Sequence, residues 1–215
     1  MMILEDIFVF GASGHSKVVI DIIERTGCYK VAFLVDDNPA LAGRGFFGYQ
    51  VIGGKSELLN ARSDGGPHRG FVAIGSNSAR ASVADWLEIN GFERVTLVHP
   101  SAQIARGVRI DQGTVIMAGS IVNSDSSIGR EVIINTGATV DHDCVIKNGA
   151  HIAPGVTLCG TVTVGIRSFI CAGATIIPNL TIGSGVVVGA GATVVKDLPD
   201  NVIVTGTPSR IIRKI

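Results

Sequence analysis

The chain has 215 residues, enough for one or two domains, and its 18 basic and 18 acidic side chains balance. No basic stripe stands out, which argues against a nucleic-acid surface, and no apolar stretch approaches the roughly 18 residues that a membrane span needs. The four cysteines show no CxxC spacing and the N-terminus shows no signal pattern, so we expect a cytoplasmic protein without a membrane span.

The first 97 residues predict a small α/β domain. Apolar runs that indicate buried strands alternate with amphipathic helical patterns, an order typical of a parallel, Rossmann-like sheet. The expected strands lie within residues 1–10 (apolar part 7–10) and at 31–35, 71–74 and 95–97, and the expected helices follow residue 15, with Val18, Val19, Ile22 and Ile23 on one side, and cover 78–90. Residues 43–54 are expected to form a loop with one short strand, and residues 61–69 an exposed loop.

Polar residues and glycines follow three of these strands. They are GASGH at 11–15, the aspartate pair at 36–37 and GSN at 75–77. The carboxyl ends of parallel strands meet at one sheet edge, where a glycine-rich turn before a helix suits a phosphate and an aspartate can accept hydrogen bonds from a ribose or a base. We therefore expect a nucleotide site, although a GxxG spacing alone is also compatible with an ordinary first turn of an α/β unit.

From Val98 to Val194 every sixth residue is Ile, Val or Leu, at seventeen consecutive positions. The residue four places after each of them is mostly small. This hexapeptide repeat predicts a parallel β-helix in which three hexads close one triangular coil and successive coils stack about 4.8 Å apart. The expected domains are residues 1–97 (α/β, with the nucleotide site), 98–199 (β-helix) and 200–215 (a C-terminal cap).

Within the repeat, His142 stands between Asp141 and Asp143 at the third, outward position of its hexad. Two flanking carboxylates favour the charged imidazole, so this histidine can accept a proton near neutral pH. The alternative is a solvated surface histidine in an acidic corner. Asn135, Asn123 and His151 are further outward polar candidates.

Two other kinds of chemistry are disfavoured. Cys144 and Ser168 occupy inward positions, which argues against a covalent nucleophile. His142 and His151 are half a coil apart and only His99 joins them, so we expect no metal.

The order of five motifs resembles one family. They are GASGH at 11–15, the aspartates at 36–37, AIGSN at 73–77, VDHDC at 140–144 and GTPSR at 206–210. Together they resemble the sialic acid O-acetyltransferase-like (NeuD/PglD-type) nucleotide-sugar N-acetyltransferases of the hexapeptide-repeat acyltransferases. The resemblance implies a left-handed β-helix and a homotrimer, with acetyl-CoA bound and the active site formed between adjacent solenoids.

The resemblance also implies roles for individual residues. The catalytic residues are His142 as general base, Asp143 as its acidic partner and Asn135 near the reacting centre. The nucleotide-sugar contacts are Ser13, Gly14, His15, Asp36, Asp37 and Gly75. The acetyl-CoA contacts are His151, Ala172 and Ala190.

The expected function is acetyl-CoA-dependent N-acetylation of a nucleotide-linked amino sugar in bacterial glycan or surface polysaccharide biosynthesis. A UDP-4-amino-4,6-dideoxy sugar is the first candidate substrate and a GDP-perosamine-like sugar the next. The alternatives are O-acetylation of a sialic acid or another sugar, and a non-catalytic nucleotide-sugar-binding protein. A purely structural solenoid is disfavoured because it would present regular outward Thr columns, whereas the outward residues of this sequence are irregular.

Overall fold

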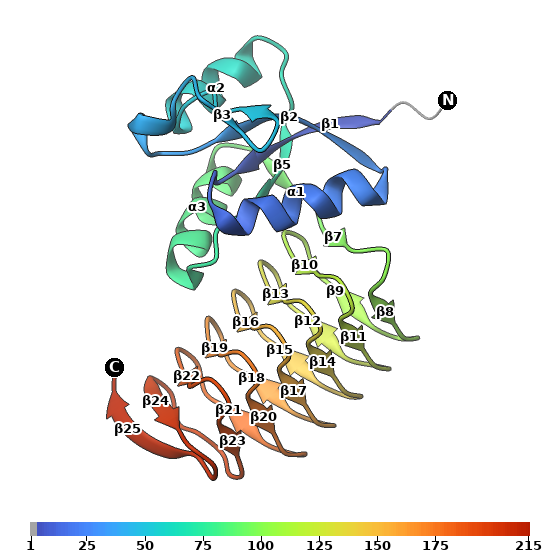
Figure 1. The fold of residues 1–215 in the computed structure, drawn as a ribbon, viewed down its shortest axis with the longest axis vertical. Coiled ribbons are helices and arrows are strands. Elements are labelled where there is room, and N and C mark those ends of the chain that lie inside the picture. Colours follow the sequence, from blue (N-terminus) through green and yellow to red (C-terminus); the bar gives the residue numbers. More distant parts are fainter. Residues whose placement is uncertain (1–3) are drawn as a thin grey trace. The chain divides into compact units, whose positions relative to one another are not determined.

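The structure, a computed structural model, describes residues 4–215 and divides into two compact units that meet between Leu97 and Val98 (Figure 1). The expected strand-like run over residues 1–10 begins with residues 1–3, which lie outside the described part. The elements of the first unit are β1 (Glu5–Phe10), α1 (Gly14–Thr26), β2 (Tyr29–Val35), a 3-10 turn (Pro39–Leu41), β3 (Gly45–Phe46), β4 (Tyr49–Gln50), α2 (Lys55–Ser63), β5 (Arg69–Val72), α3 (Asn77–Ile89) and β6 (Glu93–Arg94).

The first unit is built on a four-stranded parallel sheet in the order β2-β1-β5-β6. Its apolar core includes Phe8 and Phe10 of β1, Val35 of β2 and Leu87 of α3. Helix α1 ends at Gly27, whose left-handed backbone (φ 61°) is the usual helix stop. This sheet and its helices confirm the α/β prediction for the N-terminal part of the chain.

Five local predictions in this unit are wrong. Residues 43–54, expected to contain one short strand, contain two, β3 and β4, which pair in the antiparallel direction. The fourth strand of the sheet is Glu93–Arg94 rather than 95–97; it lies at the edge of the sheet, and its Glu93 forms an ion pair with Arg69 of β5 (3.3 Å). The third strand ends at Val72 rather than residue 74. Residues 55–63, partly assigned to loops, form α2, a mostly polar helix in which only Leu58 is buried among the residues described. Finally, α1 buries Ile20 and leaves Val18 exposed.

The second unit is a parallel β-helix of about six turns, in which every strand of the repeat has two residues and ends on a rung of the sequence ladder (Figure 1). The strands are β7 (Leu97–Val98), β8 (Gln103–Ile104), β9 (Arg109–Ile110), β10 (Val115–Ile116), β11 (Ile121–Val122), β12 (Ser127–Ile128), β13 (Ile133–Ile134), β14 (Thr139–Val140), β15 (Val145–Ile146), β16 (His151–Ile152), β17 (Thr157–Leu158), β18 (Thr163–Val164), β19 (Phe169–Ile170), β20 (Thr175–Ile176), β21 (Thr181–Ile182), β22 (Val187–Val188) and β23 (Thr193–Val194). From β7 to β20, each strand pairs with the one 18 residues further on, as Val115 does with Ile133. The predicted β-helix is thus confirmed; its left-handedness stays a prediction.

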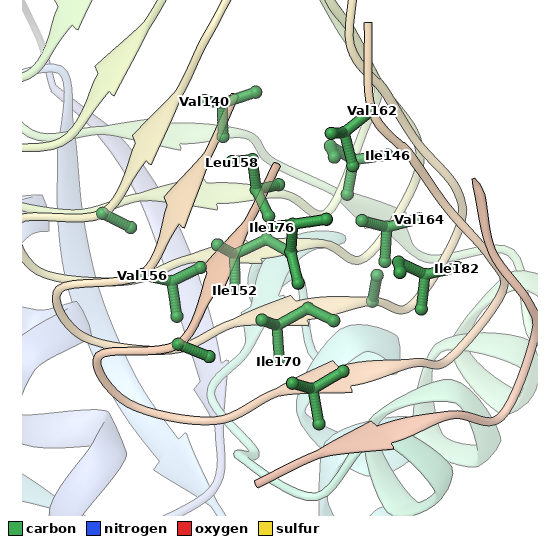
Figure 2. Close-up of a cluster of buried hydrophobic side chains, with 14 of the residues drawn as sticks. Val140, Ile146, Ile152, Val156, Leu158, Val162, Val164, Ile170, Ile176 and Ile182 are labelled. Atoms are coloured by element: carbon green, nitrogen blue, oxygen red, sulfur yellow. The ribbon is translucent and has the colours of Figure 1, made fainter. Parts of the chain in front are cut away.

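These strands form three faces. Face 1 runs from β7 to β22 in steps of three strands, face 2 from β8 to β23 and face 3 from β9 to β21. We call the turns from face 1 to face 2 corner 1–2, those from face 2 to face 3 corner 2–3, and those from face 3 to face 1 corner 3–1. Inside, side chains such as Val140, Ile152 and Ile170 stack in layers (Figure 2), and all three are fully buried.

The end of the chain continues face 1. Strand β24 (Val202–Thr205) pairs in parallel with β22, and β25 (Arg210–Lys214) pairs with β24 in the antiparallel direction. Leu198, Val202 and Val204 are buried and belong to the same apolar core as the rungs. The last coil is therefore covered by the tail.

One expectation about the outer surface is wrong. Face 2 presents a regular ladder of Thr139, Thr157, Thr175 and Thr193, each paired in register with the next. The outward residues of this face are therefore regular, and they do not argue against a purely structural solenoid. The evidence against a purely structural role must come from the residues at the corners. Among the described residues, no helix is long and apolar enough to cross a membrane.

Candidate active site

His142 lies at corner 2–3, where the chain leaves β14. Its side chain is 57% exposed, and its Nδ1 lies 2.8 Å from a carboxylate oxygen of Asp143. Asp141 does not take part in this contact: its Oδ1 accepts the backbone N–H of His142 (2.8 Å) and the side-chain N–H of Asn123 from the preceding coil (2.9 Å). Asp143 thus orients the ring and Asp141 holds the backbone.

The electrostatics at this corner favour proton acceptance. The hydrogen bond with Asp143, and then the charge of Asp141, raise the pKa of His142 above its usual value. The hydrogen bond from Asn123, followed by that from the His142 backbone, lowers the pKa of Asp141 and keeps this carboxylate ionised. With Nδ1 engaged by Asp143, Nε2 is the nitrogen available for exchange of a proton with a bound molecule.

Asn135 lies at corner 1–2, on a different edge of the solenoid from His142. Its side-chain nitrogen is 3.1 Å from Nε2 of His151, and its Oδ1 accepts the backbone N–H of Thr136 (2.8 Å). His151 is 8% exposed and its ring stacks on Phe169 with 4.8 Å between centroids. Within one chain, the structure therefore brings Asn135 together with His151 and not with His142.

Ala172 and Ala190 also lie at corner 1–2, in one column with Thr136 and Pro154. The carbonyl oxygens of Thr136, Pro154 and Ala172 each accept a backbone N–H from the next coil, at 3.0, 3.0 and 2.9 Å. Both alanines are exposed, and each precedes a glycine with positive φ. Small side chains and glycines leave a smooth strip along this edge. At about 4.8 Å per coil, its three steps from Thr136 to Ala190 cover roughly 14 Å.

In the first unit, the start of α1 lies at the carboxyl edge of the sheet. Ser13 caps the helix, and Ser13, Gly14 and the half-buried His15 form its first turn. Gly11 has a φ of 117°, and a Cβ there would lie 2.8 Å from the carbonyl oxygen of Ala73. This glycine is therefore needed for the close passage of the loop over β5.

The two aspartates after β2 are engaged with the surrounding backbone. Asp36 accepts hydrogen bonds from the backbone N–H groups of Ala12 (2.8 Å) and Asn38 (2.9 Å). Asp37 accepts the backbone N–H of Lys55 and forms an ion pair with its ammonium group at 3.4 Å. Both aspartates line a pocket of about 340 Å³ between the end of β2 and the start of α2. The carboxylates thus hold the backbone that forms the pocket wall, and they also line the pocket themselves.

Arg80 is a site residue that the sequence analysis missed. Its side chain is fully buried, and its guanidinium donates to the carbonyl oxygens of Ile74 (3.0 Å) and Gly75 (3.2 Å) and to the side chain of Asn77. Burial, and then the charge of Arg80, lower the pKa of His15 to about 4, so this histidine is neutral at pH 7. The available signal was an arginine four residues after the helix cap Ser76, on the side of α3 that faces the sheet.

The residues described contain no group of three or more His, Cys, Asp or Glu side chains that could hold a metal ion.

Solved structures match this chain over nearly its whole length, and a family model matches its N-terminal part. Residues 6–87 match the family model described as the PglD N-terminal domain. Perosamine N-acetyltransferase from Caulobacter crescentus, crystallised with CoA and GDP-perosamine as a histidine-to-asparagine variant, is 41% identical and superimposes with a TM-score of 0.92 over 99% of both chains. The acetyltransferase domain of PglB from Neisseria gonorrhoeae, in complex with acetyl coenzyme A, is 37% identical, with a TM-score of 0.89 over 97% of this chain and 100% of that one.

A curated relative matches a shorter stretch. UDP-N-acetylbacillosamine N-acetyltransferase from Bacillus subtilis (strain 168) is 35% identical over 115 residues, which are 54% of this chain and 52% of that protein. The match thus spans about half the length of that relative. The full-length agreement with the perosamine enzyme, together with the PglD N-terminal domain and the hexapeptide β-helix, shows that the chain belongs to the PglD-type N-acetyltransferases of the hexapeptide-repeat acyltransferase superfamily.

Proposed function

We propose that the protein transfers the acetyl group of acetyl-CoA to the amino group of a nucleotide-linked amino sugar for glycan biosynthesis. The observation that carries the proposal is the exposed His142–Asp143 pair, on a chain that matches a GDP-perosamine N-acetyltransferase over 99% of its length. The pair supplies a base with a raised pKa in a position that a bound molecule can reach.

In the proposed reaction the neutral sugar amine attacks the thioester carbonyl carbon. A C–N bond forms and Nε2 of His142 accepts the proton that the amine loses, while the Asp143 carboxylate stabilises the imidazolium through Nδ1. The C–S bond then breaks and the CoA thiolate leaves. The mechanism needs no covalent enzyme intermediate, consistent with the burial of Cys144 and Ser168.

The nucleotide moiety binds in the first unit. Backbone N–H groups at the start of α1 can receive the diphosphate, because a helix N-terminus favours anions. The neutral His15 and the pocket beside Asp36 and Asp37 offer contacts for the rest of the nucleotide. Since a relative that matches 99% of this chain was crystallised with GDP-perosamine, a GDP-linked amino sugar is the first substrate to test, followed by UDP-linked ones.

The acetyl-CoA lies along the strip at corner 1–2, beside His151, Ala172 and Ala190. Corners 1–2 and 2–3 are the two edges of face 2, so His142 and this strip do not meet within one chain. If three chains turn face 2 toward a common threefold axis, corner 2–3 of one chain approaches corner 1–2 of the next. This geometry supports a homotrimer, and the use of acetyl-CoA fits a cytoplasmic location.

The test is release of CoA thiol from acetyl-CoA with a panel of GDP-, UDP-, dTDP- and CMP-linked amino sugars, with mass spectrometry of the product. We expect turnover with one member of the panel and an acetyl group on nitrogen. An acetyl group on a hydroxyl would support sugar O-acetylation instead. Nucleotide-sugar binding without thiol release from any member would support a non-catalytic binding protein.

The assignment of the base is tested with His142→Ala. General-base catalysis is worth ~10²–10⁴-fold, and kcat should fall by this factor. His68→Ala is the matched control, because His68 is exposed and lies outside the repeat. Near-full activity of His142→Ala would refute the assignment.

A further inference from the structure

Gly160 lies next to the ring of His142. It stands 18 residues further along the chain at corner 2–3, and the corners stack through their backbones: Thr161 donates to the carbonyl of His142 (2.9 Å) and Asn179 to that of Gly160 (3.0 Å). A Cβ built on Gly160 would lie 2.7 Å from both Cε1 and Nε2 of His142, and 3.3 Å from Cδ2. The imidazole therefore rests over the Cα of Gly160, in space that any side chain would occupy.

The backbone conformation does not explain why this residue is glycine. Other corner glycines, such as Gly155 (φ 66°) and Gly173 (φ 68°), have left-handed backbones that favour glycine, whereas Gly160 is outside that region. The three nearest atoms that its Cβ would meet all belong to His142. At this position the need for glycine comes from the imidazole ring.

We propose that Gly160 is a positioning residue for the catalytic base: the absence of its side chain lets the His142 ring keep Nδ1 on Asp143 while Nε2 faces the reacting amine. The proposal rests on the proposed function, in which His142 is the base. The ring is fixed at one end by the 2.8 Å contact with Asp143, and it lies over Gly160 at the other. A side chain at Gly160 would act on the ring edge that includes Nε2 itself.

Gly160→Ala tests the proposal. A Cβ contact of 2.7 Å must lengthen to at least 3.4 Å to become an ordinary one. The ring must therefore move by at least about 0.7 Å, and a displacement of about 1 Å can lower kcat by ~10²-fold. Because the His142 side chain is 57% exposed, it can move into solvent, so the unfolding midpoint should stay close to that of the unchanged protein.

The pH–rate profile separates positioning from a purely structural role. The contact with Asp143 is the largest cause of the raised pKa of His142. If the ring leaves Asp143, this pKa falls, and the acid limb of the kcat profile moves to lower pH because the neutral base then persists to lower pH. The same shift should be visible in the imidazole proton chemical shifts of His142 during an NMR titration.

Two glycine variants serve as controls. Gly45→Ala adds a Cβ in open space at a residue without positive φ, so activity and stability should not change. Gly165→Ala places a Cβ 2.4 Å from the backbone carbon of Gly183, so the fold requires glycine at this position. This variant should lower the unfolding midpoint, and it shows what a purely structural effect looks like. Adding Gly160→Ala to His142→Ala should cause no further loss of activity, because the ring is already absent.

The outcomes are distinct. Wild-type kcat and an unshifted pH profile in Gly160→Ala would overturn the proposal, as would a loss of activity accompanied by a Gly165-like loss of stability. A further loss in the double variant would also overturn it. If His142→Ala itself keeps full activity, the assignment of the base fails first, which distinguishes the failure of the proposed function from that of Gly160.

Discussion

Ser126 connects the stability of the β-helix to the corner that carries His142. Its side chain is fully buried, and its hydroxyl donates to the carbonyl oxygen of Asp141 (2.8 Å) and accepts the backbone N–H of Cys144 (3.0 Å). One hydroxyl thus binds both ends of the four-residue corner around His142. We predict that Ser126→Ala destabilises this corner in particular.

The size of the effect follows from the groups that lose their partner. Each buried backbone group left without a hydrogen-bond partner costs about 1–3 kcal/mol. Ser126→Ala leaves two such groups, the carbonyl of Asp141 and the N–H of Cys144. The corner can recover part of it by closing on itself, as Ala138 does when its N–H donates to the carbonyl of Asn135 at 3.0 Å. We therefore expect the free energy of unfolding to fall by about 2–3 kcal/mol.

Ser120→Ala is the matched control. The Ser120 hydroxyl is also buried and donates to the carbonyl of Asn135 (2.8 Å), but that carbonyl already accepts the N–H of Ala138. Only the net value of one hydrogen bond is lost, about 0.5–1.5 kcal/mol.

Urea unfolding at a single protein concentration measures both variants, and hydrogen exchange at the Cys144 amide measures the local effect. In Ser126→Ala that amide should exchange faster, and kcat should fall because the backbone around His142 is less well held. An equal decrease in the free energy of unfolding for the two serine variants, or an unchanged exchange rate at the Cys144 amide, would refute the reasoning.

Two further predictions concern the reaction. In Asp143→Asn the pKa of His142 should fall, because the main cause of its elevation is removed. The neutral base then persists to lower pH, so the acid limb of the kcat profile should move to lower pH. An unmoved limb would show that Asp143 does not raise the pKa of the base. Ala190→Leu adds bulk to the strip at corner 1–2 and should raise the KM for acetyl-CoA by about tenfold, equivalent to ~1.4 kcal/mol, with the KM for the nucleotide sugar unchanged. An unchanged KM for acetyl-CoA would exclude this edge as the cofactor path.

The solenoid could be predicted from the sequence because its rule is local. A two-residue strand turns one side chain inward, and three strands close the coil, so Val140 and Leu158 had to be rungs 18 residues apart. The same regularity put His142 on the outside and Cys144 on the inside, which identified a candidate base and argued against a covalent nucleophile.

The first unit was harder to predict, because its errors lie where polar residues form regular structure. The edge strand β6 (Glu93–Arg94) consists of two charged residues, so no hydrophobic pattern predicts it. Helix α2 has one buried residue among those described, Leu58, so its apolar stripe was too thin to detect. Arg80 was missed for the opposite reason: a charged residue was expected at the surface and lies fully buried.

By itself, the sequence determined the β-helix, the outward place of His142 and the motifs that are proposed to bind the nucleotide. Only the tertiary structure decided that Asp143 contacts the ring while Asp141 holds the backbone, and that Asn135 lies with His151 on another edge. It also decided that His142 rests over Gly160. The physical reason is that a repeat fixes which direction each side chain takes from its own coil, but not the hydrogen bonds within a corner or the contacts with residues of neighbouring coils, such as Asn123 and Gly160.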